Sequence, residues 1–135
     1  MTETIEDLKA YVNAQLRLHC EPVPPKTDTS QQVHLSVWTK RGRRKAIGVE
    51  LDHADRVNLW VVSMYVPISL PKSVIVANKV WHGSAWRDKK HVPGEKERGA
   101  NSNLKGYDEF RRKPITRLGI QSMKDAQAIL GHLFS

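Results

Sequence analysis

The hydrophobic pattern of this chain changes its period near Val33, and this change limits the fold more than any other feature. Before that point, apolar residues such as Leu8, Val12 and Leu16 recur at the spacing of a helix that buries one face. From Val33 onward, apolar and polar residues alternate, which is the period of a half-buried strand. One chain that carries both periods predicts an α+β fold.

Turn signals divide the chain into five segments. A predicted helix covers 2–20, and a connector rich in proline covers 21–32. Strands cover 33–81 and begin with a three-stranded meander, whose last strand, VNLWVVSMYV, is apolar almost throughout and is expected at the centre. Residues 83–113 form a long basic loop, and residues 114–134 form a last strand and a helix. We therefore expect a single domain with a mainly antiparallel sheet of four to five strands and with the N-terminal and C-terminal helices packed on one face.

Composition argues against several classes of protein. The chain has 135 residues, enough for one core, and a single cysteine, Cys20, so it cannot form an internal disulfide. Its first residues are acidic where an export signal would be basic, and no apolar run approaches the ~18 residues of a membrane span. These features predict a cytoplasmic protein without a membrane partner.

Positive charge is concentrated in two parts of the sequence. The net charge is +8, from 22 Lys and Arg against 14 Asp and Glu, and the excess falls within 40–45 and 72–117. Such clustering predicts a polyanionic partner. The alternative is that the charge serves solubility alone.

The densest basic group surrounds the tip of a predicted hairpin. Long cationic side chains there would project together towards a phosphate backbone, and they belong to Lys40, Arg41, Arg43, Arg44 and Lys45. Alternatively, a basic turn of this kind only prevents unwanted strand pairing.

Two further groups lie in or beside the long loop. In the first, aromatic rings are interleaved with cations, which suits stacking on unpaired bases, and its members are Trp81, His82, Trp86, Arg87, Lys89, Lys90 and His91. Tryptophan is more often a core residue, and we expect this of one of the two. In the second, polar groups either contact nucleic acid or serve the turns of the loop, and its members are Asn101, Ser102, Asn103, Lys105, Tyr107, Arg111, Arg112, Lys113 and Arg117.

Catalytic patterns are weak by comparison. A metal-dependent nuclease would need clustered carboxylates near a lysine, and the candidates are Glu50, Asp52 and Asp55 beside Lys45. A metal-independent nuclease would instead use His82 and His91 as acid and base. The sequence has no phosphate-binding glycine motif and no zinc-ligand spacing, so we expect no cofactor.

The sequence therefore predicts a nonenzymatic domain that binds DNA or RNA. The basic hairpin would contact phosphates, and Trp86 with Arg87, Lys89 and Lys90 would engage the strand, with further contacts from Lys105, Arg111 and Arg112. The first alternative is an inhibitor or adaptor module that docks on an acidic protein partner through the same residues. The second is a small nuclease.

Overall fold

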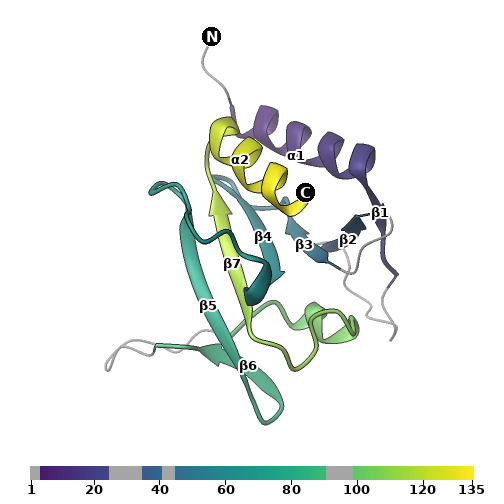
Figure 1. The fold of residues 1–135 in the computed structure, drawn as a ribbon, viewed down its shortest axis with the longest axis vertical. Coiled ribbons are helices and arrows are strands. Elements are labelled where there is room, and N and C mark those ends of the chain that lie inside the picture. Colours follow the sequence, from purple (N-terminus) through teal and green to yellow (C-terminus); the bar gives the residue numbers. More distant parts are fainter. Residues whose placement is uncertain (1–3, 25–34, 41–44, 91–98) are drawn as a thin grey trace.

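An antiparallel sheet forms the centre of the molecule (Figure 1). The computed structural model describes residues 4–24, 35–40, 45–90 and 99–135. Within them, seven strands are arranged in the order β1-β2-β3-β4-β7-β5-β6. Their bounds are β1 Cys20–Pro22, β2 Ser36–Lys40, β3 Ala46–Glu50, β4 Val57–Val62, β5 Ile75–His82, β6 Ala85–Asp88 and β7 Ile115–Ile120. Because β2, β3 and β4 pair in succession, the predicted three-stranded meander is confirmed.

The sheet has more strands than the four to five that the sequence predicts. The additional strands are β1, which spans the end of the predicted helix and the start of the predicted connector, and β6, in the predicted long loop. β1 has three residues and β6 has four, too few for an alternating pattern to be read from sequence. Both lie at the edges of the sheet, where short strands limit pairing with other chains.

Two helices, α1 (Ile5–His19) and α2 (Met123–Leu133), lie at the same end of the molecule (Figure 1). α1 begins three residues later than predicted, because Thr4 caps it: Thr4 Oγ1 accepts from Asp7 N, and the Asp7 carboxylate accepts from Thr4 N. The helices share one hydrophobic cluster with the sheet, so they cover the same face, as predicted. None of the helices in the described residues is long and apolar enough to cross a membrane.

Strand β4 is buried on both faces, which explains its nearly continuous apolar sequence. Leu59 faces the helices, whereas Trp60 belongs to a second hydrophobic cluster on the opposite face. The second cluster is covered by residues 99–113, which contribute Leu104, Tyr107 and Phe110 and include the short 3-10 helix η3 (Ser102–Gly106). Residues 99–113 of the predicted long loop therefore form a packed layer.

Gly48 allows this layer to lie directly on the sheet. A Cβ atom at this position would lie 3.1 Å from Leu104 Cδ2 and 3.2 Å from Trp60 Cβ. Both distances are shorter than ordinary van der Waals contacts, so a larger residue would push the layer away from β3. The layer in turn carries several of the cations that the sequence predicts to contact nucleic acid.

Candidate nucleic-acid interface

The structure describes only the base of the predicted basic hairpin. Lys40 ends β2 and Lys45 precedes β3, whereas Arg41, Arg43 and Arg44 lie outside the described residues. The Lys45 ammonium lies 5.6 Å from the centre of the Tyr65 ring, within the range of a cation–π contact.

The two tryptophans of the β5–β6 hairpin have different surroundings. Trp86 is 3% exposed, and its indole Nε1 donates a 2.7 Å hydrogen bond to the Lys113 carbonyl. Its ring meets that of Trp81 edge to face, at 5.0 Å between centres and 81° between planes. Trp86 is therefore the core residue of the pair and offers no free face for a base, whereas Trp81 is only half-buried.

Trp81 lines a cavity of about 400 Å³ between the β5–β6 turn and the 99–113 layer. We call it the Trp81 cavity. Its other lining residues are Gly83, Ser84, Ser102, Lys105, Gly106, Arg111 and Arg112. None of these described residues carries a carboxylate, and three carry a positive charge. Lys105 Nζ lies 6.0 Å from the centre of the Trp81 ring, so a cation already faces the aromatic surface.

Backbone turns of unusual conformation form both walls of the cavity. Gly83, at the β5–β6 turn, has a φ of 62°, which glycine adopts without strain. Arg112 has a φ of 65°, in the left-handed region that residues with a side chain rarely adopt. The Lys113 N–H to Phe110 carbonyl bond of 3.1 Å closes the turn that contains Arg112. Backbone strain of this kind is concentrated at functional sites.

No known protein family, curated protein or solved structure matches this chain. The Trp81 cavity is therefore interpreted from its own geometry and charge.

A buried carboxylate fastens the 99–113 layer to the sheet. Glu50, at the end of β3, accepts a 2.8 Å hydrogen bond from Asn101 Nδ2 through Oε2. Its Oε1 accepts from Asn58 Nδ2 at 2.9 Å and lies 3.0 Å from His53 Nε2. Asn101 also caps η3, because its Oδ1 accepts from the Asn103 N–H at 3.0 Å. Glu50 thus holds the start of the segment that carries Lys105.

The pKa of Glu50 shows which of two opposing effects is stronger. Burial of the carboxylate is the largest single effect and raises the pKa, whereas hydrogen bonds from the amides of Asn101 and Asn58 lower it. Smaller effects from Trp60 and His53 act in the same direction, so the pKa lies below its ordinary value of 4.5. The side chain is therefore a charged anchor at neutral pH.

The carboxylates considered for a nuclease have other partners. Asp55 accepts from Arg56 at 3.2 Å, and Asp52 Oδ1 lies 3.8 Å from His53 Nε2. In the parts of the chain that the structure describes, no group of three or more His, Cys, Asp or Glu residues is placed to hold a metal ion. Of the two candidate catalytic histidines, His82 is exposed at the end of β5, and His91 lies outside the described residues.

The remaining predicted contacts lie away from the Trp81 cavity. Arg87 is exposed on β6, and Lys89 and Lys90 line a separate hollow at the end of that strand. The cavity thus combines Lys105, Arg111 and Arg112, which the sequence predicts as contacts, with Trp81, which the sequence places beside cations without assigning it a contact. Ser84 and Gly106 have no sequence signal that could have found them, because their role depends on a contact between segments distant in the chain.

Proposed function

We propose that this chain is a nonenzymatic nucleic-acid-binding protein and that the Trp81 cavity is its central contact. The observation that carries the proposal is the composition of the cavity wall, which combines an aromatic ring with three cations. Arginine matches phosphate oxygens through paired N–H groups, and a tryptophan face accepts any base. An unpaired nucleotide would therefore place its base on Trp81 and its phosphate near Arg111 and Arg112.

A second basic group lies at the same end of the sheet. Thr39 of β2 pairs with Ala46 of β3, and Val62 of β4 pairs with Ile115 of β7. β5 pairs with β7 so that its turn into β6 extends beyond Ile115. The register thus puts Lys40 and Lys45 at the end of the sheet that carries the Trp81 cavity, which supports an extended phosphate contact.

Binding of labelled oligonucleotides across a salt series tests this proposal. We expect the double variant Arg111→Ala with Arg112→Ala to bind single strands roughly tenfold more weakly near physiological salt. The slope of log affinity against log salt should also fall by roughly 1.4, because two phosphate contacts are lost. Fluorescence anisotropy with single- and double-stranded DNA and RNA measures both quantities.

A matched control removes the same charge from the helices. Arg17 in α1 and Lys124 in α2 are exposed, so Arg17→Ala with Lys124→Ala should leave both affinity and slope close to wild type. Equal weakening by both double variants would mean that only net charge matters, and would refute the cavity as the contact. Tight, saturable binding to one acidic protein, with only weak, salt-sensitive binding of oligonucleotides, would instead support a protein-interaction module.

A further inference from the structure

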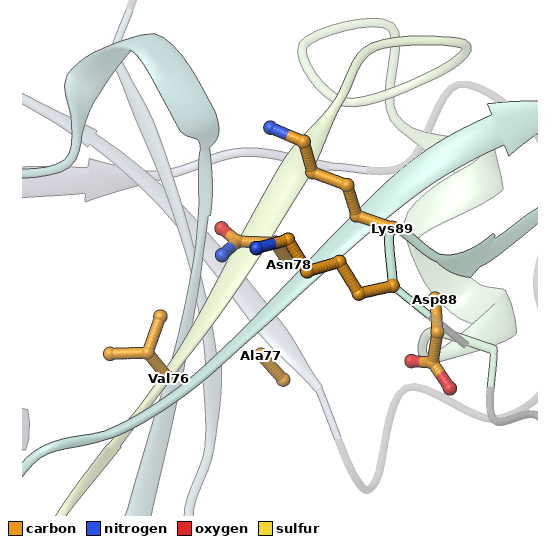
Figure 2. A pocket seen from close by; sticks show the side chains of 6 residues that line it. Val76, Ala77, Asn78, Asp88 and Lys89 are labelled. Atoms are coloured by element: carbon orange, nitrogen blue, oxygen red, sulfur yellow. The ribbon is translucent and has the colours of Figure 1, made fainter. Parts of the chain in front are cut away.

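A second hollow lies on the other face of the β5–β6 hairpin. The alternation of side chains puts Thr116, Asn78 and Val80 on the face opposite Trp81 and Trp86, beyond the part that the helices cover. Two adjoining hollows of about 470 and 440 Å³ share Asn78 and Lys89 as lining residues. We call them together the Asn78 cleft (Figure 2).

A row of backbone and side-chain bonds crosses three strands at this cleft. Thr116 in β7 is paired with Asn78 in β5, and the Lys89 N–H donates to the Asn78 carbonyl at 3.1 Å. The last bond continues the β5–β6 ladder by one residue and fixes Lys89 opposite Asn78. The Lys89 side chain extends over the cleft on the same side as the Asn78 amide (Figure 2).

The hydrogen bonds of this row have a defined direction. Thr116 is buried, and its Oγ1 donates to Asn78 Oδ1 at 2.8 Å. Because the Thr116 hydroxyl has one proton, the 2.8 Å bond between Ser63 Oγ and Thr116 Oγ1 must be donated by Ser63. The amide oxygen of Asn78 is therefore occupied, and its two Nδ2–H groups are left as donors on the cleft side.

The cleft carries positive charge beside the hydrogen-bond donors of Asn78. Lys89 and Lys90 are exposed and line the cleft, each with an ammonium that has three donors. Asp88 also lines the cleft, but it is paired with the buried Lys79, and its carboxylate points away from Lys89 (Figure 2). Donors and positive charge thus converge without a competing carboxylate from Asp88.

We infer that the Asn78 cleft is a second anion-binding site, which takes an oxyanion of the phosphate class. The two ammonium groups and the amide offer more N–H donors than the two oxygens of one carboxylate can accept. A phosphate has at least three acceptor oxygens around one centre, so it can accept from all three side chains. The site does not depend on the Trp81 cavity. The phosphate belongs either to a nucleic-acid backbone or to a free phosphate compound.

Titration of the full-length protein with inorganic phosphate, followed by NMR of the Asn78 side-chain amide and the backbone around Lys89, tests the site. We expect a saturable shift in the wild type. Asn78→Asp keeps the shape of the side chain but replaces its donors by acceptors, so binding should weaken at least roughly tenfold. Lys89→Ala with Lys90→Ala should weaken it similarly, whereas Arg17→Ala with Lys124→Ala should not.

Thr116 offers a test of the orienting hydrogen bonds. Thr116→Val removes the hydroxyl that fixes the Asn78 amide, so it should weaken phosphate binding severalfold. Thr116→Ser retains the hydroxyl, so its phosphate affinity should stay close to that of the wild type. No saturable shift in the wild type, or equal phosphate affinity in Asn78→Asp, would overturn the inference.

Oligonucleotide binding by the same variants identifies the source of the phosphate. A loss of oligonucleotide affinity in Asn78→Asp would show that the cleft holds a backbone phosphate, and unchanged affinity would show that it takes a free phosphate compound. The variant Arg111→Ala with Arg112→Ala should retain the phosphate shift, so a failure at the Trp81 cavity is distinguishable from a failure here.

Discussion

At the scale of single residues, two tryptophans five positions apart have different roles. Trp86 is closed in by its bond to the Lys113 carbonyl and by the second hydrophobic cluster. Trp81 is half-buried and borders a cavity with three cations. Both rings lie on the same face, because Trp81 pairs directly with Trp86 across β5 and β6, so the difference arises from the 99–113 layer, which covers one ring more fully than the other.

Alanine substitutions should separate these roles. Trp86→Ala should lower the free energy of unfolding by about 3–5 kcal/mol, because it leaves a cavity in the core. Trp81→Ala should cost less stability than Trp86→Ala but weaken single-strand binding by about 1–3 kcal/mol, and Trp81→Phe should keep part of that binding. Urea unfolding and fluorescence anisotropy measure the two effects. Undiminished binding by Trp81→Ala would remove stacking from the proposed contact.

At the scale of elements, the 99–113 layer is held on the sheet by apolar contacts and by the Glu50 carboxylate. Leu104 and Phe110 are fully buried, and Glu50 receives the Asn101 donor at the edge of the layer. Because the carboxylate is surrounded by donors, replacing it leaves buried N–H groups without an acceptor.

Glu50→Gln should therefore destabilise the protein by about 1–3 kcal/mol at neutral pH. The pKa of Glu50 is lowered in the folded protein, so its contribution is complete above the ordinary value of 4.5 and is lost as the pH falls through the folded value. The difference in Tm between wild type and variant should accordingly shrink at acidic pH. A difference that is constant from pH 7 to pH 3 would contradict an ionic anchor.

At the scale of the whole molecule, one strand joins two hydrophobic clusters. Leu59 of β4 packs under the helices and Trp60 of the same strand packs under the 99–113 layer. Loss of either cluster exposes β4, so the two faces should unfold together.

Leu104→Ala tests this coupling. We expect a loss of about 2–5 kcal/mol, with tryptophan fluorescence and far-UV circular dichroism still changing at the same urea concentration. Fluorescence reports mainly the layer side, through Trp60 and Trp86, and circular dichroism reports the helices on the other face. Separate midpoints would show that the layer unfolds independently.

The sequence by itself determined the elements whose pattern is local and long enough to read. Helical spacing from Leu8 to Leu16 predicts α1, alternation predicts β2 and β3, and the apolar run at 57–62 predicts a central strand. The clustering of Lys105 with Arg111 and Arg112 was also visible, because these residues are near one another in the chain.

Only the tertiary structure decided the short edge strands, the burial of Trp86 and the pairing of Trp81 with the 99–113 layer. β1 and β6 are too short to carry a period, and their pairing energy comes from neighbouring strands rather than from their own sequence. The Asn78 cleft depends on Ser63, Thr116 and Asn78, which are distant in sequence and meet through strand register. Register is set by packing over the whole sheet, and this is why a local reading of the chain could not find the site.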